Sequence, residues 1–343
     1  MKSYTIKDIA KLAEVSPGTV DRVIHNRGKV SEKALVKVKA VLEEIDYEPN
    51  VLAQSLKNQK ILLIEVLMPH IHEDEYWKQI HEGIQAFSQQ YKGFGLKISV
   101  HHFSSLDPSS FVQVANEALK RGVDAFLITP LFLNESIAFE KELQRQGIPL
   151  ITINNEINDI KPLTFIGQNL IESSRTAANL IAQCSKDLKD IIIIHISEDP
   201  FNASYLSTKA QGVRDYFKGK GVDIHEITLN NPENDIQNLI QMSKDLSPNP
   251  GYFITTSKAH LVAAELRRHS PNSVIVGYDL IHQNIDLLVD HKINFLINQN
   301  PYKMAFEGLA KFADKLVFSR SLEPHYYLPI DIINSENIHS YIK

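Results

Sequence analysis

The 343-residue sequence has only one cysteine, Cys184, which excludes an internal disulfide and a cysteine-rich zinc site. Because small residues flank it in a helical stretch, Cys184 is expected to be a small buried side chain. The sequence has no apolar run near the roughly 18 residues that a membrane-spanning helix needs. The first residues lack the apolar core of a signal peptide, so we expect a cytoplasmic protein.

Motifs of catalysis are also missing. No expected strand is followed by the G-x-G-x-x-G or Walker pattern that cradles a phosphate, and the sequence contains no G-x-S-x-G elbow. Metal-ligating side chains are concentrated in the segment His70-Ile71-His72-Glu73-Asp74-Glu75, which lacks the H-E-x-x-H spacing and an identifiable third ligand. The sequence therefore predicts no catalytic residues, no metal site and no cofactor, and the protein is not expected to be an enzyme.

Charge is distributed unevenly along the chain. Residues 1–40 contain nine basic and four acidic side chains, a formal charge of +5. The remaining residues contain 27 basic and 37 acidic side chains, a formal charge of −10. A basic segment attached to an acidic body suggests that the segment binds a polyanion.

The basic segment has the spacing of a helix-turn-helix. Thr5 and Asp8 form a capping pair at the start of one helix, and Ser16 followed by Pro17 starts a second helix. The second helix would fit the major groove of DNA, where the fork of the Arg22 guanidinium matches the O6 and N7 acceptors of guanine. A third helix follows. The alternative is a three-helix cap whose charged face is only solvated.

The segment after these helices predicts a short hinge helix. Residues 47–57 contain a Pro49-Asn50 helix start and place Ala53 and Leu56 on one face. A helix this short is unstable alone in water, so it should form only when another surface packs against it. The alternative is an ordinary linker.

From residue 61 onward, apolar runs alternate with amphipathic stretches. Strands are expected at 61–67, 96–102, 123–129, 148–153, 190–196, 222–229, 251–256, 273–278 and 293–298. Helices are expected near 74–91, 109–121, 134–146, 169–186, 203–219, 233–246, 258–269, 281–291 and 302–318. Two successive sets of apolar strands and helices predict an α/β body of two doubly wound parallel-sheet subdomains with a cleft between them. Ligands of such folds lie beyond the carboxyl ends of the strands.

Several side chains near the expected strand ends suit a polyol pocket, which needs flat aromatic faces and forked polar groups. Tyr76 and Trp77 follow the first strand and would supply the aromatic face. The alternative is that Trp77 anchors the core beneath its helix. Asn154 and Asn155 end a strand on the cleft side.

The segment TIKDIAKLAEVSPGTVDRVIHNRGKVSEKALVKVKAVLEEIDYEPNVLAQSL resembles the head and hinge of the lactose/galactose repressor (LacI/GalR) family. The shared motifs are D-x-A-x-x-A-x-V-S-x-x-T-V-x-R-V, then V-S, then Y-x-P-N-x-x-A-x-x-L. The resemblance implies that Pro17, Gly18 and Arg22 lie at base-reading positions. It also implies that Leu56 wedges into the minor groove at the operator centre and kinks the duplex.

Spacing and resemblance together define the predicted DNA-binding residues. Lys7 and Thr19 are placed to contact phosphates, which position a protein without reading sequence. The full set is Thr5, Lys7, Ser16, Pro17, Gly18, Thr19, Arg22, His25, Asn26, Asn50, Ala53 and Leu56.

The body resembles the effector domain of the same family, a fold shared with periplasmic sugar-binding proteins. The resemblance rests on Phe165-Ile166-Gly167-Gln168-Asn169 with Arg175, on Lys209-Ala210-Gln211-Gly212, on Gly277-Tyr278-Asp279 and on Gln299-Asn300-Pro301. It implies that Lys209 clamps ligand oxygens and that Asp279 accepts ligand hydroxyls, whereas Thr255-Thr256-Ser257-Lys258 departs from the usual T-N-D. The predicted effector-binding residues are Tyr76, Trp77, Asn154, Asn155, Asn169, Lys209, Ser257, Asp279 and Gln299.

Together these features predict a sequence-specific DNA-binding transcription regulator of the repressor type. The predicted domains are a helix-turn-helix head at 1–47, a hinge helix or linker at 48–59, and a two-lobed effector-binding and dimerisation domain at 60–343. A homodimer would bind a pseudopalindromic operator in double-stranded DNA. A sugar or sugar derivative would occupy the cleft, where Lys209 among neutral amides permits an acidic sugar.

Alternatives remain. In the first alternative, the effector is a purine or another metabolite that acts as corepressor. In the second alternative, the protein is a sugar-binding receptor without DNA function. An enzyme acting in the cleft is the third alternative, because a fold does not fix a function. No membrane partner is expected.

Overall fold

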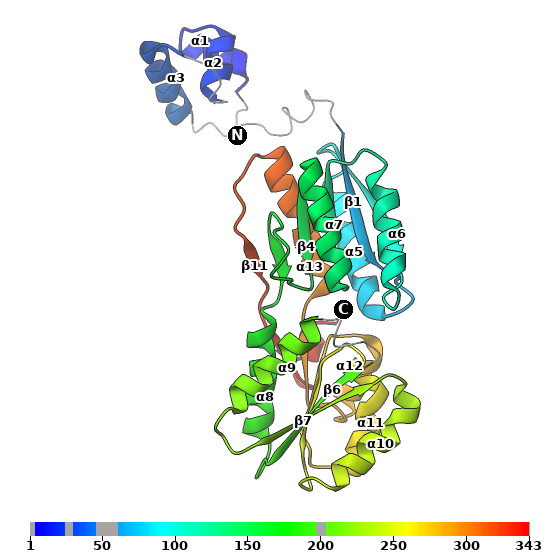
Figure 1. The fold of residues 1–343 in the computed structure, drawn as a ribbon. Helices are drawn as coiled ribbons and strands as arrows, with labels where there is room; N and C mark the ends of the chain where they lie inside the picture. Colours follow the sequence, from blue (N-terminus) through cyan, green and yellow to red (C-terminus); the bar gives the residue numbers. More distant parts are fainter. Residues whose placement is uncertain (1–3, 25–29, 46–60, 197–203, 343) are drawn as a thin grey trace. The chain divides into compact units, whose positions relative to one another are not determined.

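The computed structural model describes residues 4–24, 30–45, 61–196 and 204–342. The chain divides into two compact units, Met1–Lys57 and Asn58–Lys343, and each is described by itself (Figure 1). The predicted hinge at 48–59 lies outside the described residues. Among the helices that are described, none is both long and apolar enough to cross a membrane.

In its described residues, the first unit contains three helices that pack together. They are α1 (Ile6–Leu12), α2 (Pro17–Ile24) and α3 (Glu32–Glu44). Apolar side chains at helical spacing form its core, which contains Ile9, Ala10, Ala13, Val20 and Val38. Thr5 caps α1: its hydroxyl accepts the N–H of Asp8, whose carboxylate accepts the N–H of Thr5 in return. The three expected helices and the capping pair are confirmed.

The first lobe of the second unit has six parallel strands in the order β11-β5-β4-β3-β1-β2. These are β1 (Leu62–Pro69), β2 (Leu96–Phe103), β3 (Ala125–Ile128), β4 (Leu150–Ile153), β5 (Phe165–Gly167) and β11 (His325–Tyr327). The helices packed on the sheet are α5 (Glu75–Gln90), α6 (Pro108–Leu119), α7 (Leu133–Gln146) and α13 (Pro301–Phe312), which continues into a π-helical turn, η1 (Ala313–Val317). Strands and helices share one apolar core.

The second lobe has six strands in the order β12-β10-β9-β8-β6-β7, with only β12 antiparallel to its neighbour. These are β6 (Asp190–Ile196), β7 (Asp223–Leu229), β8 (Gly251–Ile254), β9 (Ile275–Tyr278), β10 (Phe295–Asn298) and β12 (Asp331–Ile333). Its helices are α8 (Leu170–Cys184), α9 (Ser204–Phe217), α10 (Pro232–Lys244), α11 (His260–His269) and α12 (His282–Val289), with a final 3₁₀ turn, η2 (Ile338–Ser340). Helices α8 and α9 share one core with the sheet, and α10, α11 and α12 share another. The prediction of parallel sheets covered on both faces is confirmed.

The chain passes between the lobes after β5, after β10 and between β11 and β12. As a result α13, drawn in orange in Figure 1, packs into the core of the first lobe although it follows five strands of the second. Every expected strand and helix of the body has a counterpart. Strands β5, β11 and β12 are not predicted because each has only three residues, fewer than a periodic pattern needs.

One expectation about burial is wrong. Cys184 is exposed, because it is the last residue of α8 and lies beyond the buried stripe that ends at Ile181.

Candidate functional site

The exposed face of α2 is the first candidate site. The Ser16 hydroxyl accepts the N–H of Thr19 at 3.2 Å and lies 2.9 Å from the Thr19 hydroxyl, so the start of α2 is fixed. Pro17, Gly18 and Arg22 are exposed, whereas the opposite face of the helix is part of the core. A helix with this division has a polar face that is free to enter a groove of DNA, and the contacts with bases stay a prediction.

Two further predicted DNA contacts lie at α1. Lys7 is exposed on α1. Thr5 is exposed as well, but its hydroxyl donates to the Asp8 carboxylate at 2.7 Å, so this side chain serves the helix cap. The other predicted DNA-binding residues lie outside the described residues: His25, Asn26, Asn50, Ala53 and Leu56.

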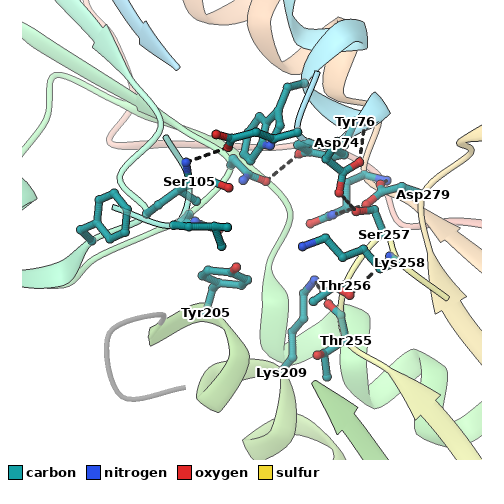
Figure 2. A pocket seen from close by; sticks show the side chains of 18 of the residues that line it. Asp74, Tyr76, Ser105, Tyr205, Lys209, Thr255, Thr256, Ser257, Lys258 and Asp279 are labelled. Carbon is teal, nitrogen blue, oxygen red and sulfur yellow. Dashed lines mark hydrogen bonds between the residues drawn. The ribbon is translucent and has the colours of Figure 1, made fainter. Parts of the chain in front are cut away.

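The second candidate site is a cavity of about 530 Å³ lined by both lobes of the larger unit (Figure 2). The lining comes mainly from loops that follow strands and from the first turns of helices. The lining residues are Glu73, Asp74, Tyr76, Trp77, Ser105, Leu106, Pro108, Leu131, Phe132, Asn154, Asn155, Tyr205, Lys209, Asn230, Thr255, Thr256, Ser257, Lys258, Asp279 and Gln299.

The cavity brings together eight of the nine predicted effector-binding residues. Asn169 is not among the described residues that line it. Its side chain caps α8 by accepting the N–H of Glu172 at 3.1 Å. That the other eight bind an effector stays a prediction.

Asp279 lies at the end of β9 and is only 1% exposed. Its two carboxylate oxygens accept the backbone N–H and the side-chain amide of Gln299, at 3.1 and 2.8 Å. Burial raises the pKa of Asp279 to about 6, although the charge of Lys209 and the Gln299 hydrogen bonds act to lower it. Asp279 is therefore mainly ionised at neutral pH and is protonated in mild acid.

The backbone is strained where the strands reach the cavity. Asp279 has φ +66°, Asn154 has φ +74°, and Asn300, next to Gln299, has φ +54°. The left-handed region is unfavourable for residues with a Cβ, and such strain concentrates at ligand sites. The positions of these three residues fit a site whose geometry is set for binding rather than for stability.

Lys209 is charged yet only 3% exposed. Its Nζ donates to the carbonyl oxygen of Thr255 at 2.7 Å and lies 3.6 Å from the centre of the Tyr278 ring. Behind Thr255, Nδ1 of His195 lies 2.8 Å from the Thr255 hydroxyl, and Nε2 lies 3.0 Å from Glu226. Because burial lowers the pKa of His195, a neutral imidazole supports the strand end that holds Lys209.

Tyr76 and Trp77 belong to the core and also line the cavity. Their rings meet edge to face with centroids 4.9 Å apart, and both belong to the core of the first lobe. Both also line the cavity, and the Tyr76 hydroxyl donates to the side-chain oxygen of Asn154 at 2.6 Å. The aromatic wall is therefore held in place by the core behind it.

The start of α5 is bonded to the second lobe. Asp74 accepts the Tyr76 N–H through one oxygen and the Ser257 hydroxyl through the other, at 2.9 and 2.6 Å. Gln79 donates to the carbonyl of Leu280 at 3.0 Å, and the N–H of His282 donates to Glu75 at 3.1 Å. These three bonds between the lobes, from Asp74, Glu75 and Gln79, form what we call the α5 clasp. They hold the lobes together beside the cavity.

Several lining residues are not predicted from the sequence. Asp74 lies in the segment considered for a metal, and Tyr205 begins a helix without a motif. Lys258 lies in the segment that departs from the family pattern. Their shared signal is position, because each follows a parallel strand or begins a helix at the carboxyl edge of a sheet.

Four histidines gather near this edge of the first lobe. The ring centres of His70 and His72 are 4.9 Å apart, those of His70 and His102 are 5.7 Å apart, and those of His81 and His102 are 6.0 Å apart. Within the described part of the chain, no group of three or more potential ligands is arranged to hold a metal ion.

Comparisons with known proteins cover both units. Residues 5–50 match the model of the lacI family of bacterial regulatory proteins, and residues 64–317 match the model of a periplasmic binding protein domain. The sucrose operon repressor of Streptococcus mutans is 25% identical over 97% of this chain and 99% of that protein. The ribose operon repressor of Lactococcus lactis is 22% identical over 97% of this chain and 98% of that protein. A solved LacI transcriptional regulator from Bacteroides fragilis has a TM-score of 0.75 and 26% identity, over 82% of this chain and 100% of that one.

Proposed function

We propose that this chain, which belongs to the lacI family of bacterial regulatory proteins and is a DNA-binding transcription regulator, acts as a repressor. A carbohydrate-like effector bound in the cavity controls its affinity for DNA. Two relatives that match nearly its whole length are named as repressors of a sucrose operon and a ribose operon. Those names support a sugar or sugar derivative as the class of effector.

The cavity is the observation that carries this proposal. It combines aromatic faces from Tyr76 and Trp77 with amide and carboxylate groups from Asn154, Gln299 and Asp279. Aromatic faces pack against the C–H surface of a sugar ring, and forked polar groups accept and donate to its hydroxyls. A volume of about 530 Å³ is in the range of small-molecule sites.

The first unit supplies the DNA contacts of the proposal. Arg22 reads a base from the exposed face of α2, and Lys7 contacts a phosphate. A homodimer places two such units on the half-sites of a pseudopalindrome, with the hinge segments of residues 48–59 at its centre. The protein acts in the cytoplasm, where the operator is located.

Control follows from linkage between two binding sites. If effector binding favours one arrangement of the lobes and operator binding favours one arrangement of the hinge, each ligand changes the affinity of the other by the same factor. The α5 clasp supports this mechanism, because its hydrogen bonds join the two lobes beside the cavity and a change in the arrangement of the lobes would alter them.

The test uses the purified full chain. Operator sequences are selected from a random duplex pool, and the affinity for the selected operator is measured with and without sucrose, ribose, other sugars and purines. We expect a marked preference over random duplex and a change of operator affinity with at least one sugar. A response only to purines would replace the carbohydrate proposal, and lack of any sequence preference would contradict the DNA contacts assigned to α2.

The remaining alternatives have less support. A receptor without DNA function does not account for the lacI match of residues 5–50. The relatives matched over their whole length are named as regulators rather than as enzymes. Recovery of unchanged effector after incubation with the protein would agree with a binding role.

A further inference from the structure

Among the described residues that line the cavity, three carry a carboxylate and two carry an ammonium group, and this excess of acid defines a narrower class of effector. We propose that the effector is an uncharged sugar, and that Glu73 is the residue that excludes sugar acids and sugar phosphates. This inference rests on the proposed function, because it concerns the same cavity. It replaces the acidic sugar that the sequence permits, since Lys209 shares the cavity with acids as well as with neutral amides.

Both lysines of the cavity already have partners within the protein. Lys209 donates from Nζ to the carbonyl oxygen of Thr255 and lies over the Tyr278 ring. Its charge also acts on Asp279. Lys258 interacts with another residue of the chain as well. Because an ammonium taken out of water needs such partners, a ligand anion would have to compete for both cations with groups that the protein supplies.

Asp74 and Asp279 lie close enough to repel each other. Burial raises the pKa of Asp279 to about 6, and the charge of Asp74 adds to this rise, although Lys209 opposes it. Neutral donors orient a carboxylate but leave its charge in place, as where Asp74 accepts the Tyr76 N–H and the Ser257 hydroxyl. An anionic ligand would add a third negative charge beside this pair.

Two buried tyrosines report the sign of the electrostatic potential at this wall. Burial raises the pKa of Tyr76 well above its ordinary value, and the charges of Asp279 and Asp74 raise it further. Burial also raises the pKa of Tyr278 against the effect of its hydrogen bond with Ser173, and the charge of Asp279 adds to the rise. A tyrosine becomes an anion when it loses its proton, so the same carboxylates disfavour an anion at both hydroxyls.

Glu73 adds a third carboxylate at a different edge of the cavity. It accepts the N–H of Ser105 at 2.8 Å, and Figure 2 shows Ser105 well separated from Asp279. Partial burial acts to raise the pKa of Glu73, but hydrogen bonds from Ser105 and Ser104 hold it below its usual range, and the charge of a nearby histidine acts in the same direction. Glu73 is therefore ionised at neutral pH. Within the ranges that the structure describes, no lysine or arginine forms an ion pair with it.

The two helix ends beside Glu73 also carry negative charge. Asp74 is the N-cap of α5, and Asp107 is the N-cap of α6, which begins at the lining residue Pro108. Each of these carboxylates accepts an N–H of the first turn, at 2.9 Å in both helices. A helix N-terminus is equivalent to about half a positive elementary charge, so a full carboxylate charge exceeds it. These two ends therefore do not offer an anion site.

A neutral sugar meets these carboxylates as a donor. Each sugar hydroxyl carries a proton that a carboxylate oxygen can accept, and an ionised carboxylate can accept several such bonds. A phosphate or carboxylate on the ligand instead brings at least one like charge, and like charges placed side by side are strongly unfavourable. Repulsion of this kind separates a sugar from its phosphate, although the two share nearly all of their hydroxyls.

The test compares matched sets of compounds on the full chain by calorimetry and thermal shift. The sets are glucose with glucuronate and glucose 6-phosphate, galactose with galacturonate and galactose 6-phosphate, ribose with ribose 5-phosphate, and sucrose with sucrose 6-phosphate. In at least one set we expect the neutral sugar to bind at least about tenfold more tightly than each charged member, because the charged group is repelled by the carboxylates of the cavity.

Variants assign this discrimination to Glu73. Glu73→Gln keeps an oxygen that can accept the Ser105 N–H but removes the charge, so the preference for the neutral sugar should fall at least about threefold. Glu73→Asp keeps the charge and should keep the preference. Glu82→Gln is the matched control, because Glu82 is exposed on α5 and is not among the lining residues. Melting temperatures show whether each variant is folded.

The outcomes separate this inference from the proposed function. A charged member that binds as tightly as its neutral sugar, or a preference that Glu73→Gln leaves unchanged, overturns the inference. If the compound that binds also changes operator affinity, the proposed function stands while the inference fails. Binding of none of these compounds overturns the inference and removes the support for a carbohydrate effector as well.

Discussion

Asp279 shows at the scale of one residue how a binding site opposes stability. A carboxylate that is 1% exposed and has a left-handed backbone is unfavourable in both respects. Gln299 and Lys209 offset only part of this cost, since the pKa of Asp279 is still raised to about 6. We propose that a residue kept under these conditions serves to bind a ligand rather than to stabilise the fold.

Asp279→Asn is expected to make the protein more stable at neutral pH and unable to bind effector. In the folded protein Asp279 keeps its proton up to a pH of about 6, whereas its ordinary pKa is 3.8. The free energy of unfolding therefore falls as pH rises between these two pKa values. Asp279→Asn does not lose this stability, because its side chain has no proton to release in this range. Unfolding by urea should show a gain on the order of 1–3 kcal/mol at pH 7 that shrinks toward pH 4. A gain that is the same at both pH values would contradict the assignment of this titration to Asp279.

Arg22 is the residue on which the DNA contacts are tested most directly. Arg22→Ala should lose about 1–3 kcal/mol of discrimination at one base pair. Lys7→Ala should weaken binding equally for all sequences and reduce its salt dependence. Lys33→Ala, on the exposed face of α3, is the control. The binding of each of these three protein variants to a library of single-base operator variants is measured. An unaltered base preference in Arg22→Ala would show that Arg22 does not read a base.

At the scale of elements, α5 connects the cavity to both lobes. Its first turns carry the α5 clasp, Tyr76 and Trp77 line the cavity from it, and its middle packs against α13 at Gly83. An effector that touches this helix therefore touches the element that bonds the lobes together.

Gln79→Ala tests the α5 clasp without altering the cavity lining. It removes the bond to the Leu280 carbonyl, a contact worth about 1 kcal/mol. Effector affinity should fall roughly fivefold, and small-angle scattering without effector should show a larger radius of gyration. Gln113→Ala is the control, because Gln113 bonds only within α6, to Glu117. Unchanged affinity in Gln79→Ala would show that the clasp does not contribute to closure.

Gly83→Ala tests the contact between α5 and α13. A Cβ at Gly83 would lie 2.2 Å from the carbonyl oxygen of Tyr302, a backbone atom that no rotamer change can move away. We expect a loss of about 1–3 kcal/mol in unfolding free energy. Gly93→Ala is the matched control, because a Cβ there meets nothing within 4 Å. Equal stability of the two variants would show that α5 and α13 separate at little cost.

At the scale of the whole molecule, the sequence predicts the two lobes and eight of the twenty residues that line the cavity for one reason. Parallel strands bring their carboxyl ends to one edge, so polar residues after apolar runs, such as Asp279, fall there. The sequence does not predict that α13 returns to the first lobe. An amphipathic pattern shows that a helix buries one face, but it does not show which of the two sheets the helix packs against. Asn169 caps α8 and is not among the lining residues, and the sequence does not separate these two roles because helix caps and ligand sites use the same amide chemistry.

The return of α13 has a consequence for synthesis on the ribosome. Met304, Leu309 and Phe312 complete the core of the first lobe, and β11 completes its sheet, yet all of them are translated after β10. While the second lobe emerges, the nascent chain holds an unfinished first lobe with its apolar side chains uncovered. Domains usually fold in the order of their synthesis, but here the half that emerges first is completed only after β10 of the second lobe has been synthesised. Truncated products should therefore aggregate rather than persist as a folded single lobe.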